Sequence, residues 1–199
     1  ELRLIADVGI IGYPNVGKST LLSVASAAKP KVASYPFTTI EPILGVVEVG
    51  QKSFVLAEIP GLIDGAHLGR GLGHDFLRHI VRTKILIHLI DGNSASPAED
   101  MIRVNTELTL FDAALVQKPQ LVVVNKVDLP QVRARLPQIK DVFSSAGTPV
   151  LFVSAAGGEG VCELMAEALK MLNQLAAKVE SGKKIPKKVF HPQPRSVGV

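Results

Sequence analysis

The sequence predicts a three-layer α/β fold, in which helices cover both faces of a mostly parallel six-stranded sheet with one antiparallel strand. Apolar runs of strand length alternate along the chain with longer segments of helical periodicity. One pair of apolar runs is joined by a short polar turn instead of a helix, which predicts the single antiparallel strand. Parallel strands need long crossovers, so each helix is expected to pack on the sheet between two of its strands.

The first elements are predicted by their apolar content and by the residues that interrupt them. Residues 4–11 form an apolar run of strand length, and residues 21–28 are small and aliphatic and end before a proline, as a helix does. Residues 29–42 hold three prolines and are expected to form a loop. Apolar runs at 43–49 and 54–59 flank a short turn, which predicts a hairpin.

The middle of the chain is predicted to contain one loop, one central strand and two helices. Residues 62–73 hold four glycines and favour a mobile loop. A helix with one apolar face is expected at 74–81. Residues 85–90 are almost continuously apolar, as expected of a parallel strand covered on both sides. Pro97 then precedes one long helix at 98–115.

The last third repeats the alternation of strand and helix. Strands are expected at 121–124 and 150–153, and helices at 131–144 and 161–179.

Composition favours one domain followed by a basic tail. The 199 residues are 47% hydrophobic, enough for one buried core at residues 1–180, whereas 181–199 are rich in Lys and Pro and are expected to lead to a further domain of a longer protein. Five of the 22 basic residues lie in that tail, so the remaining 17, against 18 acidic residues, give the body a charge of −1. The tail is interpreted as a solvated linker, with contact to RNA or an acidic partner as the alternative.

Three further features bound the class of protein. No apolar run approaches the ~20 residues that span a bilayer, and no signal sequence opens the chain, so no membrane partner is expected. A monomeric, cytoplasmic protein is expected. The single cysteine, Cys162, fits a reducing setting and is interpreted as a small apolar residue of the last helix. His88 lies inside a strand and is interpreted as a satisfied core residue instead of a metal ligand.

A phosphate-binding loop is predicted between the first strand and the first helix. Its pattern of Gly, four residues and then Gly-Lys-Ser is met by Gly12, Tyr13, Pro14, Asn15, Val16, Gly17, Lys18 and Ser19, followed by Thr20. Gly12 and Gly17 permit left-handed backbone angles, so that successive N–H groups and the helix N-terminus converge on one anion. Lys18 adds a positive charge for the outer phosphates, and the Ser19 hydroxyl is a ligand for Mg2+. The loop therefore predicts a P-loop NTPase fold.

A second group of residues is predicted to recognise a guanine base. A buried carboxylate at Asp128 would accept from N1–H and from the 2-amino group of guanine, whereas adenine presents an acceptor at that edge. The Lys126 stem would lie over the base, and the Asn125 amide would bind both the base and the loop backbone. The group comprises Asn125, Lys126, Val127 and Asp128, with a backbone donor to guanine O6 from Ser154, Ala155 or Ala156. The alternative is a helix-starting turn capped by Asp128.

These residues are expected to meet because ligands of open α/β sheets bind beyond the carboxyl ends of the strands. The phosphate loop follows the first predicted strand, and the residues around Asp128 and Ser154 follow the fifth and sixth. The third ends in Glu58, Ile59, Pro60 and Gly61.

The ordered set of motifs resembles the translation-factor-related GTPases, and within them the Obg family of ribosome-associated GTPases. The resemblance covers residues 2–156 and is carried beyond the phosphate loop by three runs, at 35–39 (Tyr-Pro-Phe-Thr-Thr), 59–66 and 69–80. It implies a glycine-rich domain before this one and often another after it, with 183–195 similar to the connector. It also implies a partner in the large ribosomal subunit or its rRNA.

The resemblance assigns two switch segments. The first comprises Phe37, Thr38, Thr39, Ile40 and Glu41, with Thr39 ligating Mg2+ beside Ser19 when GTP is bound. The second comprises Glu58, Ile59, Pro60 and Gly61, with the Gly61 N–H touching the γ-phosphate. Lys18, Asn15, Thr39 and Gly61 are the residues expected to act in hydrolysis. Loss of the γ-phosphate would release both segments.

Three positions bear on the rate of hydrolysis. Many GTPases place a Gln after the second-switch glycine to orient water, and Leu62 here predicts slow turnover. Asn15 resembles the loop Asn that helps hold K+ in potassium-stimulated GTPases, and the alternative is a turn residue. The family has Asp where this chain has Glu58, which adds a methylene between the backbone and the carboxylate that meets Mg2+ through water.

The sequence therefore predicts a Mg2+-dependent domain that binds GTP or GDP and hydrolyses GTP slowly as a switch. The resemblance implies that the switch acts in large-subunit assembly or stress signalling. A guanine-nucleotide docking module with negligible turnover is the alternative. An ATPase or nucleotide kinase is disfavoured by Asp128.

Overall fold

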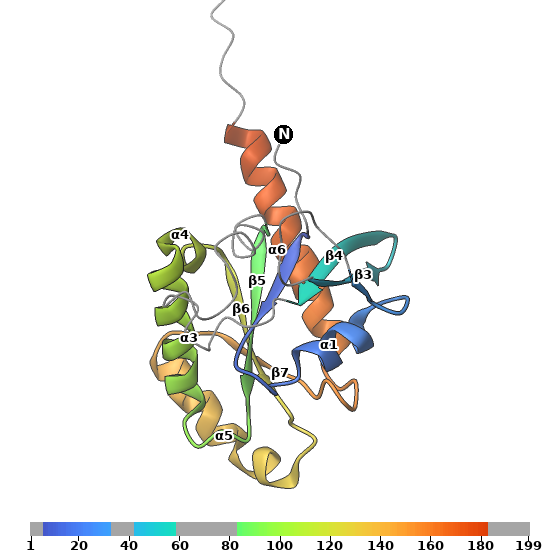
Figure 1. The fold of residues 1–199 in the computed structure, drawn as a ribbon. Coiled ribbons are helices and arrows are strands. Elements are labelled where there is room, and N and C mark those ends of the chain that lie inside the picture. Colours follow the sequence, from blue (N-terminus) through green and yellow to red (C-terminus); the bar gives the residue numbers. More distant parts are fainter. Residues whose placement is uncertain (1–5, 33–41, 59–82, 183–199) are drawn as a thin grey trace, which may run out of the picture.

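A computed structural model of the chain describes residues 6–32, 42–58 and 83–182. The elements, drawn in Figure 1, are β1 (Val8–Ile11), α1 (Lys18–Ala25), β2 (Lys31–Val32), β3 (Ile43–Val49), β4 (Lys52–Glu58), β5 (Ile85–Asp91), α3 (Pro97–Phe111), α4 (Ala113–Val116), β6 (Gln120–Asn125), α5 (Pro130–Ser145), β7 (Val150–Phe152) and α6 (Val161–Gly182). The helix predicted at 74–81 and the glycine-rich loop before it lie outside these ranges.

The sheet has the predicted class but one more strand than expected. Its order is β2-β3-β4-β1-β5-β6-β7. Only β3 runs against the others, because it pairs antiparallel with both β2 and β4 while the remaining pairs are parallel. The seventh strand, β2, has two residues and lies directly after Pro30, inside the segment predicted as a loop. A strand this short leaves no periodic pattern in the sequence.

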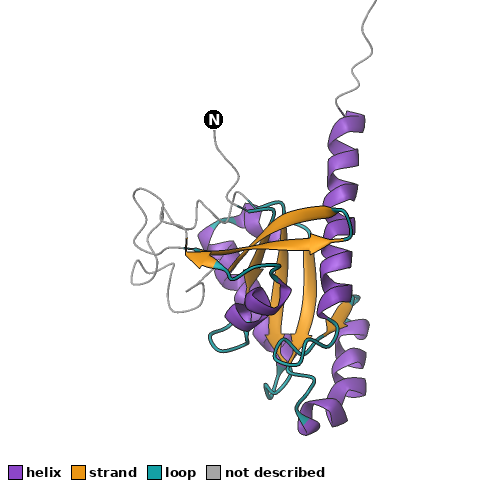
Figure 2. Cartoon of the chain, turned by 90° about the vertical axis from the view of Figure 1, so that its right-hand side faces the viewer, coloured by secondary structure: helices purple, strands orange, loops and turns teal. Residues whose placement is uncertain are grey.

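Helices cover both faces of the sheet, as predicted. Figure 1 places α1 and α6 on one side and α3, α4 and α5 on the other, and Figure 2 shows α6 running along the face of the strands. The larger core cluster joins strand residues such as Ile87 to Leu21 of α1 and Leu164 of α6. A smaller cluster joins Ile90 to Phe143 of α5. The side chains of β5 are therefore buried on both faces of the sheet, which explains its unbroken apolar sequence.

The helix expected at 98–115 is two helices, and that prediction is wrong. Asp112 takes an extended backbone (φ −155°, ψ 111°) and ends α3, and its carboxylate accepts a hydrogen bond from the N–H of Ala114 at 2.8 Å to begin α4. Aspartate is a preferred N-cap, because its side chain satisfies a backbone donor that a helix start leaves free. The apolar spacing continues across the break, so periodicity alone did not reveal it.

The structure bears on the interpretation of two single residues. Cys162 lies in the last helix, α6, as interpreted, and is exposed because Val161, Leu164 and Met165 form the buried stripe of that helix. His88 is fully buried as expected but only half satisfied: its Nδ1 lies 3.4 Å from Gln120 Oε1, and its Nε2 has no partner among the described residues. Burial lowers the pKa of His88 from 6.5 to about 4. In the described ranges, no helix has the length and apolarity to cross a membrane.

Candidate functional site

The phosphate loop joins β1 to α1 with the backbone that the sequence predicts. Gly12 (φ 148°) and Gly17 (φ 101°) have left-handed angles. A Cβ on Gly12 would collide with the carbonyl oxygen of Leu89, and one on Gly17 with the Asn125 amide. Glycine is therefore required at both positions for two independent reasons, backbone angle and space. Asn15 also has a positive φ, of 60°, and its side chain is exposed.

Lys18 lies beneath this loop and is largely buried. Its ammonium donates to the carbonyl oxygens of Gly12 at 3.0 Å and Tyr13 at 2.9 Å. Burial lowers the pKa of Lys18 from its ordinary value, and the negative charge of Glu58 partly opposes that shift. An anion bound above the loop would favour the charged form, since it adds a second negative neighbour. The two carbonyl contacts therefore hold the ammonium against the loop backbone.

Ser19 and Glu58 connect the start of α1 to the end of β4. The Ser19 hydroxyl donates to Glu58 Oε1 at 2.9 Å. Glu58 is 7% exposed, and its Oε2 has no hydrogen-bond partner among the described residues. A buried carboxylate oxygen without a partner is costly unless a cation or a water satisfies it. Two oxygen atoms beside Lys18 could therefore act as ligands for a cation. They are the Ser19 hydroxyl oxygen and Glu58 Oε2.

Asn125 fastens the base end of the site to the phosphate end. Its Nδ2 donates to the carbonyl oxygen of Val16 at 2.7 Å, and its Oδ1 accepts from the N–H of Ala155 at 2.8 Å. The side chain is 2% exposed, so both contacts lie out of water. This contact with the loop backbone is the one that the sequence predicted.

Asp128 lies in the predicted place but is not buried. Its side chain is exposed, and Oδ1 accepts a hydrogen bond from the Ser154 hydroxyl at 2.6 Å. Ser154 is fully buried and its hydroxyl also accepts from the N–H of Gly157 at 2.9 Å. The expected burial of Asp128 is wrong because the turn after β6 directs it to the open end of the site. The carboxylate is nevertheless oriented by a residue of the Ser154–Ala156 turn.

Sequence reasoning missed Asp91, the last residue of β5. Its Oδ2 lies 2.5 Å from the ammonium of Lys126. The N–H of the next residue, Gly92, donates to the carbonyl oxygen of Asn125 at 3.0 Å. A signal was available, because an Asp-Gly pair directly after a buried parallel strand stands at the same sheet edge as the other site residues.

Two neighbouring cavities, of about 230 and 270 Å³, lie at this edge. The first is lined at the base end by Asn125, Lys126, Asp128, Leu129, Ala155 and Ala156, and the second at the phosphate end by Lys18, Ser19 and Glu58. Both are also lined by Asn15, Gly17 and Thr20, so they adjoin. The structure thus brings the first, fifth and sixth predicted strand ends together with Glu58. Residues 37–41, 59–61 and Leu62 lie outside the described ranges.

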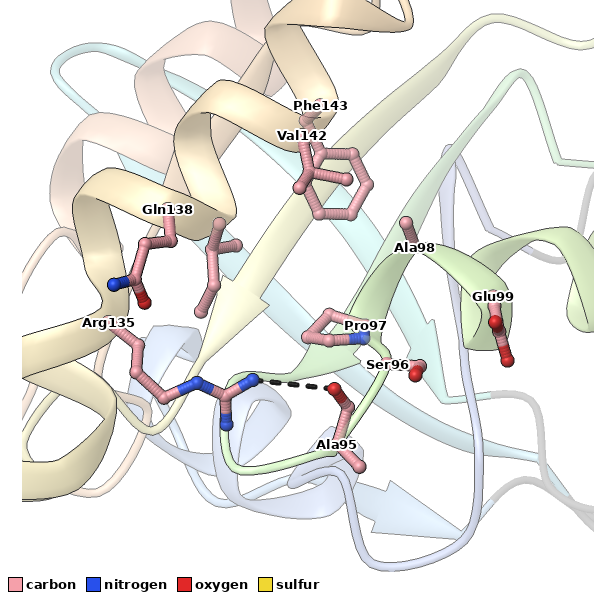
Figure 3. A pocket seen from close by; sticks show the side chains of 10 residues that line it. Ala95, Ser96, Pro97, Ala98, Glu99, Arg135, Gln138, Val142 and Phe143 are labelled. Carbon is pink, nitrogen blue, oxygen red and sulfur yellow. Dashed lines mark hydrogen bonds between the residues drawn. The ribbon is translucent and has the colours of Figure 1, made fainter.

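A third cavity, of about 340 Å³, lies between α3 and α5 and shares no lining residue with these two. Figure 3 shows Phe143 and Val142 on one side of it, Pro97 on the other, and the Arg135 guanidinium reaching the carbonyl oxygen of Ala95. Its lining is mostly apolar and carries no phosphate-binding loop. Among the described residues, most of those predicted to bind the nucleotide line the two cavities at the carboxyl edge, and none of them lines this one.

A glycine loop over a buried lysine, an Asn-Lys-x-Asp turn and a serine-containing turn, joined at the carboxyl edge of a mostly parallel sheet, define the class of P-loop GTPases. The family model described as 50S ribosome-binding GTPase matches residues 7–126, and the chain belongs to this family. Within it, the chain is a homologue of the G domain of Obg GTPases.

Two curated relatives are both described as GTPase Obg. That of Dehalococcoides mccartyi strain BAV1 is 55% identical over 197 residues, covering 98% of this chain and 46% of that protein. That of Roseiflexus castenholzii is 52% identical over 180 residues, covering 89% of this chain and 41% of that protein. The chain therefore spans less than half the length of these relatives.

Solved structures share the fold. Era in complex with MgGDPNP and nucleotides 1506–1542 of 16S ribosomal RNA has a TM-score of 0.62 and 25% identity, over 82% of this chain and 55% of that one. The G domain of the T. maritima FeoB iron transporter has a TM-score of 0.59 and 22% identity, over 82% of this chain and 96% of that one. The FeoB likeness concerns the fold alone.

Proposed function

We propose that this domain binds GTP and GDP with Mg2+ and hydrolyses GTP slowly, as a nucleotide-dependent switch. The observation that carries the proposal is the pair of adjoining cavities, which share Asn15, Gly17 and Thr20. One end offers a carboxylate and an amide, and the other offers a buried ammonium, a hydroxyl and loop N–H groups. A guanosine phosphate has complementary groups at its two ends.

Base selection would rest on Asp128. Its Oδ1 is already oriented by Ser154, and an exposed carboxylate can still accept from both N1–H and the 2-amino group of guanine. Adenine at that position would place a hydrogen-bond acceptor against the carboxylate, which would then have no donor from the base. Because adenine cannot satisfy the Asp128 carboxylate, an ATPase is disfavoured, as it was in the sequence analysis.

The residues beside Lys18 fit Mg2+. The ion prefers oxygen ligands and shares its shell with phosphates. The site supplies the Ser19 hydroxyl and Glu58 Oε2, which has no hydrogen-bond partner among the described residues. Ser19 would ligate the ion directly, Thr39 would join it by resemblance, and Glu58 would act through water or directly. When bound, the ion neutralises charge on the β- and γ-phosphates. The chain's part is to hold Ser19 in one orientation, and the contact with Glu58 does this.

Hydrolysis would depend on charge stabilisation by fixed groups more than on a general base. Lys18 and the loop N–H groups would stabilise the negative charge that shifts on the phosphates during transfer. The exposed Asn15 side chain adjoins both cavities and is available to hold K+. Because Leu62 cannot orient water, slow intrinsic turnover is proposed. The docking module with negligible turnover remains the second candidate, favoured by the same residue.

A large ribosomal subunit partner is proposed from the family alone. The family is described as 50S ribosome-binding, and Era, which shares the fold, was solved in complex with nucleotides of 16S ribosomal RNA. A role in large-subunit assembly or stress response is proposed from the resemblance alone, for a longer protein, since this chain spans less than half of its relatives' length.

Single-turnover phosphate release tests the proposal and separates it from the docking module. The domain is mixed in excess with GTP or ATP, in the presence of Mg2+ and K+, and inorganic phosphate is followed in time. Slow release from GTP and none above background from ATP is expected. Release at the uncatalysed rate from both, despite tight GTP binding, would favour the docking module.

A further inference from the structure

We propose that Asp91 is a positioning residue for guanine recognition, which acts by holding the ammonium of Lys126. The proposal rests on the proposed guanine-nucleotide function and deepens it. It concerns a residue at the end of β5 that belongs to none of the sequence motifs of the site.

The geometry around Lys126 is unusual. Its backbone has a φ of 69°, a left-handed angle that is uncommon for a non-glycine residue. Its ammonium lies 2.5 Å from Asp91 Oδ2, and Asp91 Oδ1 accepts from the N–H of Asn93 at 2.9 Å. The two side chains are 30% and 24% exposed. Each oxygen of Asp91 thus has a fixed partner, and the lysine is held at both ends, by its backbone and its ammonium.

Lys126 has a second carboxylate in its own turn. Asp128 lines the same cavity two residues further on and is the group proposed to read guanine. An ammonium on a flexible stem can pair with either carboxylate. Pairing with Asp128 would neutralise the acceptor that guanine requires. By taking the ammonium, Asp91 leaves Asp128 available and keeps the aliphatic stem of Lys126 along the cavity wall, where it can cover the base plane.

Asp91 is itself held in place from two elements. The N–H of Gly92 donates to the carbonyl oxygen of Asn125 of β6 at 3.0 Å. From α5, Gln131 Nε2 donates to Asn93 Oδ1 at 3.3 Å. Arg135 of the same helix donates to the carbonyl oxygens of Ser94 and Ala95 at 3.2 and 3.4 Å, the latter contact being drawn in Figure 3. The turn at 91–96, which carries the Asp91 carboxylate, is therefore hydrogen-bonded to both β6 and α5.

The test compares two substitutions of the same kind. Asp7 at the other end of the sheet pairs with Lys84 at 2.8 Å and is 26% exposed, which matches Asp91 and Lys126 closely. Asp91→Asn is expected to weaken GDP binding roughly tenfold, because a partly exposed charged hydrogen bond that orders the site is lost. Asp7→Asn should leave GDP affinity unchanged. Both should lower the unfolding temperature of the nucleotide-free protein by similar amounts.

A double-mutant cycle shows whether Asp91 acts through Lys126. Lys126→Met keeps an apolar stem without the ammonium, so adding Asp91→Asn to it should cause no further loss of GDP affinity. Asp91→Glu is expected to restore part of the loss seen with Asn. An additive double mutant, or equal GDP binding by Asp91→Asn and Asp7→Asn, would overturn the role of Asp91.

Comparing GDP and ADP binding by the unsubstituted domain separates this inference from the proposed function on which it rests. If it prefers GDP over ADP while Asp91→Asn binds as Asp7→Asn does, only the role of Asp91 fails. If the unsubstituted domain shows no preference between the two nucleotides, the proposed function fails first.

Discussion

The Nδ2 of Asn125 donates a hydrogen bond of 2.7 Å to the carbonyl oxygen of Val16, 109 residues earlier in the chain. The bond ties the turn after β6 to the phosphate loop, and the Oδ1 of the same side chain ties it to Ala155. One buried amide therefore sets the distance between the two ends of the site. Several consequences of this arrangement can be measured.

Removing that amide should damage both stability and binding. Asn125→Ala leaves the carbonyl oxygen of Val16 and the N–H of Ala155 without partners in a buried place, and we expect a loss of about 2–3 kcal/mol in the free energy of unfolding. GDP affinity should fall as well, because the two ends are no longer aligned. Denaturant unfolding and GDP titration measure the two effects. Asn173→Ala is the control, since Asn173 makes an exposed contact with Lys52; equal losses in both variants would contradict the role of Asn125.

Changing the carboxylate that faces the base should change which base is preferred. Asp128→Asn replaces one acceptor by a donor, which suits the C2 carbonyl of xanthine and opposes the 2-amino group of guanine. We expect GDP affinity to fall about 100-fold or more and XDP affinity to rise. Fluorescent-nucleotide competition reports both. Asp141→Asn, on the exposed face of α5, should change neither, and an unaltered GDP:XDP ratio in Asp128→Asn would exclude Asp128 as the base contact.

The serine at the start of α1 should control the response to magnesium. Ser19→Ala removes the hydroxyl held by Glu58, so the gain in GDP affinity on adding Mg2+ should shrink about tenfold, while affinity in excess EDTA stays close to that of the unsubstituted domain. Titrations at several Mg2+ concentrations measure this. Ser23→Ala on the same helix is the matched control, and an undiminished Mg2+ response in Ser19→Ala would show that the ion is held elsewhere.

Potassium should affect turnover through Asn15. The side chain is exposed next to both cavities, so we expect GTP turnover to be faster in KCl than in NaCl and Asn15→Ala to reduce that ratio toward one. Steady-state phosphate release in the two salts is the measurement. A ratio that is the same in the variant and the unsubstituted domain assigns Asn15 to the turn alone.

His88 should make stability depend on pH. Its folded-state pKa, about 4, lies below the ordinary 6.5, so the unfolded chain binds the extra proton first as pH falls. Stability is therefore complete above pH 6.5 and declines toward pH 4, by about 3 kcal/mol from this residue. His88→Leu should flatten that part of the profile, while carboxylate titrations remain in both proteins. Parallel slopes in urea unfolding from pH 7 to 4.5 would contradict the assignment.

Two geometric features of the candidate site were predictable from the sequence because they follow from local rules. The left-handed angles of Gly12 and Gly17 follow from the loop pattern, and the meeting of Asn125 with the loop follows from the order of parallel strands. The exposure of Asp128 and Cys162 depends on the orientation of a turn and of a helix. Packing against neighbouring elements sets that orientation, and the local sequence does not show it. The break at Asp112 depends on one capping bond inside an unbroken apolar spacing.

Asp91 shows a different limit. Its partner Lys126 belongs to a recognisable motif, but the pairing is made across two strands, and no fixed spacing in sequence announces it. The strand-end rule marks Asp91 as a candidate without saying what it contacts. Side-chain geometry was needed to reveal that the Asp91 carboxylate pairs with Lys126.

The most direct measurement is calorimetric titration of the domain with GDP and with ADP in the presence of Mg2+. If Asp128 and the phosphate loop hold opposite ends of one guanosine nucleotide, GDP binds in a single site at least about 1,000-fold more tightly than ADP. Equal affinities, or no heat from either nucleotide, would contradict the joined site that the two cavities and Asn125 define.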